Sequence, residues 1–471
     1  MKNFIIAILL ALVSLENQAD TLFSQGFEIK PVVRQFPYVD GSYQLPNYPV
    51  STQLQWFIQQ LSESDTSLTD INNHFDLSTM GLTAQQVKDF IQAVRNDYPD
   101  GVITDVIMVT PVRATVLIAD PLNMTQFGFT NIKAEYSGLQ RINSLGVSTF
   151  FGSVQYPADQ TLTMNQALDK FQTLSSQSSI LVAEIDSNGA CQPLYERNSS
   201  QLRATASVFK IWVLAAAAEA FLLGDIDIFQ NITLVASEMA PGGTINSEPL
   251  GTNFPLIEIA TLMLGISDNT ATDLLHETVG RDLINLVISS LNLSNPDALT
   301  PLLSINEQFH LFFSFPLATT LSYVNGTEAF QQQFLEDEIV PLGPVTTYPF
   351  NNDSIFVSGS WRASPMDICK TFSFLRDLPQ GSDSLYMTDV ALGSQVAQPD
   401  VRDHWDRVWY KGGSLTSGVN GLQVLTHAWM LENQGENPKV VITMSNDSSG
   451  GIDIYAVQSI AGRVLRLARD L

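Results

Sequence analysis

The pattern of hydrophobic and polar positions divides the chain into two parts. In the first part, residues 53–58 and 84–94 have helical spacing, and Thr83 stands where it would cap the second helix. Two apolar, strand-like runs follow at 102–109 and 112–119. Helices followed by consecutive strands predict an α+β layer in which a curved antiparallel sheet cups the helices. Such a sheet can hold an apolar ligand, or it can simply pack on the rest of the chain.

The second part has a different order of elements. Its pattern predicts, in turn, a helix at 164–174 capped by Thr163, a strand at 180–185, an Asn188-Gly189 turn, another strand and an apolar helix, and near the C-terminus strands through Lys411, at 422–431 and at 440–444, then a helix at about 451–468. This order predicts an antiparallel sheet flanked by helices from both ends, with an all-helical half inserted after the first strands. The expected fold class is α+β, with a small domain at 20–155 and a larger one at 156–471.

Candidate chemistry lies at the start of the apolar helix. Ser207 is the only serine that stands three positions before a lysine, and the apolar run at 211–221 predicts a buried helix after it. We expect Ser207 in the first turn, with the amine of Lys210 within reach of its hydroxyl. A nucleophile, a proton acceptor and free backbone amides would then meet in four residues. A single such pair is expected by chance roughly once in a few hundred residues.

Two further motifs change that balance. Ser267-Asp268-Asn269 follows an apolar stretch, and Lys411-Gly412-Gly413-Ser414 follows the strand-like residues 407–410. Neither is specific alone, because Ser-x-Asn recurs elsewhere in the chain and Lys-Gly-Gly is common in turns. The ordered set of three motifs is improbable by chance. We expect all three to converge in a cleft between the sheet and the helical half.

With these three motifs, the chain resembles the class A β-lactamases and penicillin-binding proteins, a group of serine hydrolases. The resemblance implies that Ser207 is the acylated nucleophile and that Lys210 is its general base or part of the proton relay. The other implied roles are a proton shuttle at Ser267, a substrate-amide ligand at Asn269, positive potential for a substrate carboxylate at Lys411, and oxyanion-hole amides at Ser207 and Ser414. Gly412 and Gly413 would let a substrate approach the strand edge.

The chain departs from class A enzymes in one respect. Those enzymes carry a Glu-x-x-Leu-Asn loop whose glutamate activates the deacylating water, and no such pentapeptide lies between Asn269 and Lys411. Glu307 and the residues at 336–338 do not fit it. A positioned general base contributes about 10²–10⁴-fold in rate, so we expect acylation with slow turnover of β-lactams.

A two-domain subgroup of the same superfamily also lacks this glutamate. The stretches at 260–273, 361–369 and 409–414 resemble that subgroup, which includes the β-lactamase-like hydrolase of clavulanic acid gene clusters. Its members place a small domain resembling steroid isomerases ahead of the hydrolase. The resemblance implies the same layout here, with a hydrolase that acts on a β-lactam, ester or amide. The alternatives are a penicillin-recognising or ligand-binding protein with little turnover, and a cell-wall peptidase.

The N-terminal sequence and the composition limit which partners and which cellular compartment we expect for this protein. Residues 1–19 read as a cleavable signal peptide, which predicts an exported, periplasmic or secreted protein without a stable membrane anchor. The net charge of −25 excludes nucleic acid as an expected partner, and leaves a small-molecule or peptide substrate. The five histidines have no zinc-binding spacing, so we expect no metal and no cofactor. For Cys191 and Cys369, two small buried residues are favoured over a bridge. The oligomeric state is left open.

Overall fold

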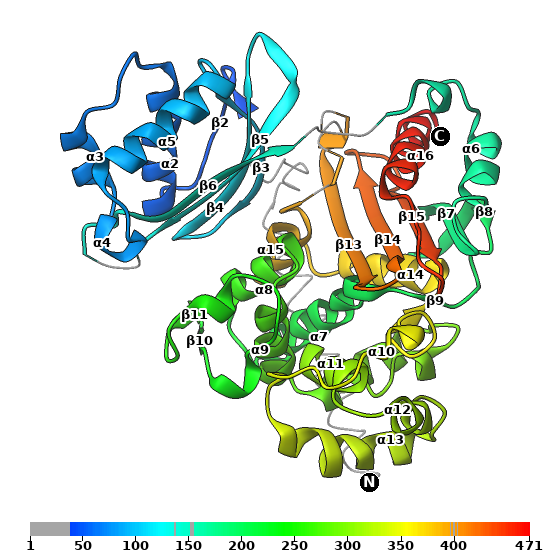
Figure 1. Ribbon diagram of the computed structural model, residues 1–471. Coiled ribbons are helices and arrows are strands. Elements are labelled where there is room, and N and C mark those ends of the chain that lie inside the picture. The colour runs from blue at the N-terminus through cyan, green and yellow to red at the C-terminus, as the bar shows by residue number, and fades with distance from the viewer. Residues whose placement is uncertain (1–37, 136–137, 151–154, 396, 399–400, 403) are drawn as a thin grey trace, which may run out of the picture. The chain divides into compact units, whose positions relative to one another are not determined.

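The computed structural model describes residues 38–471, apart from 136–137, 151–154, 396, 399–400 and 403 (Figure 1). The signal peptide expected at 1–19 lies outside the described residues. The fold class is α+β, as predicted, with one four-stranded and one five-stranded antiparallel sheet and three two-stranded pairs among the described residues. The domain boundary expected at 155 falls between β6 and the short helix η1, and it stays a prediction.

The N-terminal region contains helices followed by an antiparallel sheet, as predicted, and this sheet has four strands where the sequence indicated two. Its elements are β1 (Tyr38–Val39), β2 (Ser42–Tyr43), α2 (Pro49–Ser62), α3 (Leu68–His74), α4 (Leu77–Met80), α5 (Ala84–Asp97), β3 (Val102–Val109), β4 (Arg113–Asp120), β5 (Asn123–Ala134) and β6 (Ile142–Phe150). Thr83 and Gln86 form a capping box that starts α5. Phe57 of α2 and Ile91 of α5 share one core with Val116 of β4, so the helices are packed on the sheet by their apolar faces.

The C-terminal region is built on a five-stranded sheet in the order β13-β14-β15-β7-β8. The strands are β7 (Gln177–Ile185), β8 (Cys191–Arg197), β13 (Arg407–Ser417), β14 (Gly421–Glu432) and β15 (Lys439–Asn446). Because strand side chains alternate between faces, Leu181 and Ala183 enter one core while Ile180 and Val182 enter another. The sheet is therefore buried on both faces.

Helices from both ends of the region cover the Ile180 face, as predicted. These are α6 (Met164–Phe171) and α16 (Ile454–Leu467), which lie together beside the sheet in Figure 1 and share its core. A capping box at Thr163 starts α6, and the Asp453 carboxylate caps α16. The α6 helix ends at Phe171, three residues earlier than expected, because the chain turns there to enter β7.

The other face of the sheet is covered by the helical half. Its elements are β9 (Arg203–Ala204), η2 (Ala206–Phe209), α7 (Lys210–Leu223), β10 (Asn231–Thr233), η3 (Ala236–Glu238), η4 (Ile245–Ser247), β11 (Asn253–Pro255), α8 (Leu256–Gly265), α9 (Asn269–Val279), α10 (Arg281–Ser290), η5 (Pro296–Ala298), α11 (Ile305–Phe313), α12 (Leu317–Val324), α13 (Glu328–Phe334), η6 (Leu335–Ile339), η7 (Val340–Leu342), η8 (Asp353–Ile355), β12 (Arg362–Ala363), α14 (Pro365–Arg376) and α15 (Asp383–Leu392). Two short helices, η1 (Pro157–Asp159) and η10 (Ala468–Asp470), flank the C-terminal region.

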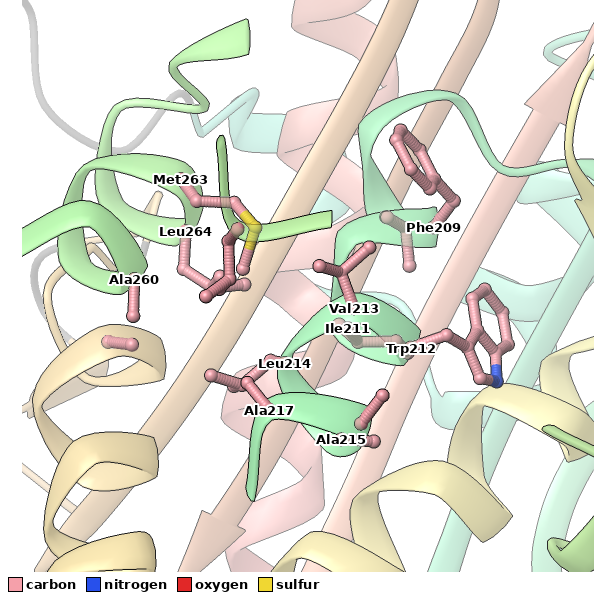
Figure 2. Packing of buried hydrophobic residues seen from close by; sticks show 14 of the residues in the cluster. Phe209, Ile211, Trp212, Val213, Leu214, Ala215, Ala217, Ala260, Met263 and Leu264 are labelled. Atoms are coloured by element: carbon pink, nitrogen blue, oxygen red, sulfur yellow. The ribbon is translucent and has the colours of Figure 1, made fainter. Parts of the chain in front are cut away.

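Helix α7 is the central helix of this half. Among the described residues, η2 and α7 together (Ala206–Leu223) are the one helical stretch long and apolar enough to cross a membrane, but 72% of this stretch is buried inside the protein. Figure 2 shows its side chains, among them Trp212, Val213 and Leu214, packed in a core that also holds Met263 and Leu264 of α8. Burial on nearly all sides explains an apolar sequence without a polar face.

The two cysteines form a disulfide, so the preference for two unpaired buried residues was wrong. Cys191 begins β8 and Cys369 lies on α14, and their Cα atoms are 6.3 Å apart. The reason is tertiary: α14 packs across β7 and β8, which places the two side chains face to face although 178 residues separate them. A bridge across so long a loop stabilises the fold by limiting the unfolded chain, typically by about 2–4 kcal/mol.

A buried ion cluster joins the four-stranded sheet to the helical half. Arg113 of β4 pairs with Glu258 of α8 at 2.9 Å and also with Glu248, which pairs in turn with Lys133 of β5. Arg113, Glu248 and Glu258 all have side chains that are at most 7% exposed. Helix α8 leads directly into Ser267, so this cluster fixes the helix that precedes one of the candidate motifs.

Candidate active site

The Ser207 segment is a tight turn and not the first turn of an α-helix. Residues Ala206–Phe209 form the 3₁₀ turn η2, and α7 begins only at Lys210. Tertiary contacts hold this turn: Thr205 N donates to Trp361 O at 2.9 Å, and the Phe209 ring stacks on Trp361 at 3.9 Å. Ser207 therefore lies in a 3₁₀ turn just before α7. This turn is held by long-range contacts, which helix propensity along the chain does not predict.

Lys210 is fully buried and bonds to the Ser267 loop. Its Nζ donates to Ser267 O at 2.7 Å, to Asn269 Oδ1 at 2.9 Å and to Ser267 Oγ at 3.2 Å. Among the described residues, no hydrogen bond joins Lys210 Nζ to the Ser207 hydroxyl; that the two groups lie within reach of each other stays a prediction. Burial lowers the pKa of Lys210 to about 7, although the charges of Asp268 and Asp273 oppose this shift.

Lys411 of β13 bonds to the same hydroxyl, that of Ser267. Its Nζ donates to Ser267 Oγ at 2.9 Å and to Gly412 O at 2.8 Å. Burial lowers the pKa of Lys411 well below its usual value, and the nearby charge of Lys210 lowers it further. Two amines that share one hydroxyl in a buried site disfavour full protonation of both, since like charges repel strongly there.

The Ser267 loop is held in a strained shape by the buried carboxylate of Asp268. Ser267 has φ of 60°, and Ala206, next to Ser207, has φ of 44°. Such left-handed conformations cost about 1–3 kcal/mol for ordinary residues and need support from their surroundings. Asp268 supplies it on the Ser267 side, because its carboxylate accepts from Ala271 N at 2.9 Å and Ile245 N at 3.0 Å.

Sequence reasoning assigned no role to Asp268, although a signal was present. An aspartate directly before a helical run is a typical N-cap, and Asp268 caps α9 in this way. The second contact, to the 244–245 turn, could not be inferred from the chain because it comes from a distant segment. A Cβ on Gly243 of that segment would lie 2.4 Å from the Asp268 carboxylate, so the close approach requires a glycine.

The two glycines of the Lys-Gly-Gly motif are required for packing inside the protein. A Cβ on Gly413 would lie 2.5 Å from Thr205 O and 2.6 Å from Ser207 N, so β13 passes directly against the Ser207 segment. A Cβ on Gly412 would meet the Tyr410 hydroxyl at 2.1 Å. The sequence suggested that these glycines admit a substrate; their observed neighbours are protein atoms.

The structure thus brings most of the expected residues together. Lys210, Ser267, Asn269 and Lys411 are joined by hydrogen bonds, and Gly413 packs against the backbone at Ser207. Ser207 is half-buried. Asn269 also donates through Nδ2 to Pro241 O at 2.7 Å, and Ser414 is exposed on β13 after Gly413. These residues come from η2, α7, the loop before α9, the first position of α9, and β13.

No carboxylate side chain bonds to this cluster in the described part of the chain. Glu307 caps α11 and pairs with Arg281, so its carboxylate is engaged elsewhere. Glu336 and Glu338 are exposed on η6. The described residues also include no group of three or more His, Cys, Asp or Glu that could hold a metal ion. The cluster therefore consists of amines, hydroxyls and one amide.

Comparison with known proteins places the C-terminal part in a familiar fold. A family described as "Beta-lactamase enzyme family" matches residues 164–322. With that match, the five-stranded sheet and the helical half give the C-terminal part a β-lactamase-like fold. A search of curated protein sequences gives no match.

Several solved structures are similar to the same part of the chain. A β-lactamase from Chitinophaga pinensis has 14% identity and a TM-score of 0.45, over 65% of this chain and 97% of that one. A β-lactamase from Sphaerobacter thermophilus has 19% identity and a TM-score of 0.43, over 65% and 94%. A PBP-A mutant, solved as an acyl-enzyme complex with penicillin G, has 16% identity and a TM-score of 0.43, over 65% and 97%.

Proposed function

We propose that the protein is a serine hydrolase that forms an acyl-enzyme at Ser207 with a β-lactam, ester or amide. The observation that carries the proposal is the shared hydrogen-bonding of Lys210 and Lys411 to Ser267 beside the Ser207 turn. Four residue types that acyl transfer requires meet there: a hydroxyl nucleophile, a base, a proton shuttle and a cation.

In the proposed acylation step, Ser207 Oγ attacks the substrate carbonyl and loses its proton to the neutral amine of Lys210. A pKa of about 7 leaves a large share of Lys210 unprotonated near neutral pH. Ser267 Oγ accepts from both lysines and keeps its own O–H available, so it can give a proton to the leaving nitrogen or oxygen. The backbone amides of Ser207 and Ser414 stabilise the oxyanion, where removing one donor costs about 2.7–4 kcal/mol.

Deacylation is proposed to be slow for β-lactams. Releasing the acyl group requires a base that activates water, and the cluster contains no carboxylate side chain among the described residues. Such a base contributes about 10²–10⁴-fold. This feature favours one alternative, a penicillin-recognising protein with little turnover. A cell-wall peptidase is a weaker alternative, because no feature of the described residues points to a peptide substrate in particular.

One experiment separates these possibilities. The protein is incubated with a labelled penicillin and examined by mass spectrometry, while hydrolysis of a chromogenic cephalosporin and of a p-nitrophenyl ester is followed in parallel. We expect an adduct on Ser207 that Ser207→Ala abolishes. A persistent adduct without ester turnover favours the penicillin-recognising protein, and ester turnover without an adduct favours the hydrolase. If the protein forms no adduct and turns over none of the three probes, the proposal is contradicted.

We further propose that residues 20–155 and 156–471 are two domains of the layout found in the clavulanic acid gene-cluster subgroup, with residues 1–19 removed on export. The Cys191–Cys369 disulfide supports an oxidising compartment such as the periplasm or the exterior. Cell fractionation followed by thiol labelling tests this: cytoplasmic protein with both thiols free would contradict export. A small-molecule or peptide substrate is the proposed partner.

A further inference from the structure

A cavity lies in the helical half, separate from the cluster around Ser267. Its volume is about 90 Å³, several times the roughly 10–15 Å³ that one water molecule requires. Arg362, Tyr323 and Trp361 line it, together with the apolar side chains of Leu303 and Val324. None of Ser207, Lys210, Ser267 and Lys411 is among its lining residues.

Two polar groups of this cavity lack protein partners. Arg362 is half-buried, and its guanidinium makes no hydrogen bond or ion pair within the described residues. Tyr323 is only 4% exposed, and its hydroxyl has no hydrogen-bond partner there either. Burial lowers the pKa of Arg362 and raises that of Tyr323, so both groups bear the cost of desolvation without a compensating bond.

We propose that this cavity binds a small carboxylate with a short apolar chain. A guanidinium presents two parallel N–H donors that match the two oxygens of a carboxylate, and a tyrosine hydroxyl adds a third donor. Leu303 and Val324 provide an apolar lining for the remainder of the ligand. One acidic residue, Asp297, also lines the cavity but is exposed, so it stays hydrated.

The cavity is connected to the Ser207 segment through one tryptophan. Trp361 lines the cavity, stacks on Phe209 at 3.9 Å, and accepts through its carbonyl from Thr205 N at 2.9 Å and from Thr205 Oγ1 at 3.1 Å. Arg362 is paired in the β-ladder with Ala204, directly before Thr205. A ligand on Arg362 therefore steadies the strand pair that carries the nucleophile turn.

Sodium butyrate is the probe for the test, with butyramide as its uncharged match. Binding is measured by isothermal titration calorimetry on the full chain, and amide hydrogen exchange of Thr205 is measured with and without butyrate. We expect saturable binding of butyrate and not of butyramide, with several-fold slower exchange at Thr205. Neither readout needs enzymatic activity, so failure of acylation at Ser207 leaves this test intact.

Three variants decide whether the cavity is the site. Arg362→Gln is expected to weaken butyrate binding at least tenfold, and Tyr323→Phe, which keeps the ring, to weaken it several-fold. Arg203→Gln is the control, because it removes a half-buried guanidinium from the paired strand that does not line the cavity. Absence of saturable butyrate binding, or equal binding by Arg362→Gln and Arg203→Gln, would overturn the proposal and leave a cavity that holds only water.

Discussion

Arg113 of the four-stranded sheet and the two lysines of the C-terminal cluster are buried cations with different kinds of partner. Arg113 of the four-stranded sheet is paired with the carboxylates of Glu248 and Glu258. Within the described part of the chain, Lys210 and Lys411 of the C-terminal cluster bond only to hydroxyl, amide and carbonyl oxygens. A paired guanidinium keeps its charge and serves structure, whereas an unpaired buried amine is driven towards its neutral, nucleophilic or basic form. The contrast separates a structural charge from a reactive one.

Replacing Lys210 should give the largest effect on activity and little loss of stability. Lys210→Met removes the proposed base while filling the same buried space, so acylation by a labelled penicillin or ester should slow by about 10²–10⁴-fold. Because the variant removes an unpaired buried amine, the free energy of unfolding measured in denaturant should stay the same or rise. Full acylation by this variant would remove Lys210 from the mechanism.

Replacing Arg113 should have the opposite pattern of effects, with a large loss of stability. Arg113→Met leaves the buried carboxylate of Glu258 without its ion-pair partner and leaves Glu248 with Lys133 alone, so the free energy of unfolding should fall by about 3–5 kcal/mol. The matched control is Lys88→Met, which breaks an ion pair with Asp65, whose side chain is 63% exposed. Exposed pairs contribute about 0–1 kcal/mol. Equal effects of the two variants in urea denaturation would contradict a structural role for the Arg113 cluster.

A third comparison is between two glycines, Gly413 in β13, which packs against the Ser207 turn, and Gly418 just after this strand. Gly413→Ala places a Cβ against Thr205 O and Ser207 N, so the turn must move and acylation should slow by about 10²-fold. Gly418→Ala is the control, because a Cβ at Gly418 would have nothing within 4 Å. The rate of acylation at Ser207 is measured for both variants. If the two alanine variants acylate equally fast, Gly413 does not position the nucleophile.

The smallest expected effect is the pH dependence that the unpaired lysine introduces. Acylation should rise about tenfold between pH 6 and pH 8, since Lys210 loses its proton near pH 7 and only the neutral amine accepts one. Stability should also rise with pH between about 7 and 10.5, because the unfolded lysine stays protonated there while the folded one does not.

The variant Lys210→Met separates the Lys210 contribution from the other titrating groups. Its unfolding free energy should lack the Lys210 part of the rise, which denaturation at a series of pH values would reveal. Arg113→Met should keep that rise, because its lysines are unchanged. Identical pH profiles for the parent protein and Lys210→Met would place the depressed pKa elsewhere.

Sequence and structure contributed different parts of this picture. Local patterns were enough for the α+β class, for the capped helices at Thr83 and Thr163, and for β3, β4 and the strands of the five-stranded sheet, because caps and periodicity depend on near neighbours. Strands β5 and β6 were not predicted. The three motifs also identified Ser207 and Lys411 as candidates before their neighbours were known. The motifs could not show which of these side chains bond to one another.

Only the tertiary structure decided how the candidate residues meet. The sharing of Ser267 by two lysines, the pairing of Cys191 with Cys369, and the packing of Gly413 on the Ser207 turn all join segments far apart in the chain. Spacing along the chain placed the Lys210 amine within reach of the Ser207 hydroxyl, and only the folded structure showed that this amine bonds to Ser267. The residue types in the sequence determine which chemical groups are available. Burial and contacts between distant segments determine which charged groups are paired, and whether the amine of Lys210 is driven towards its neutral, basic form.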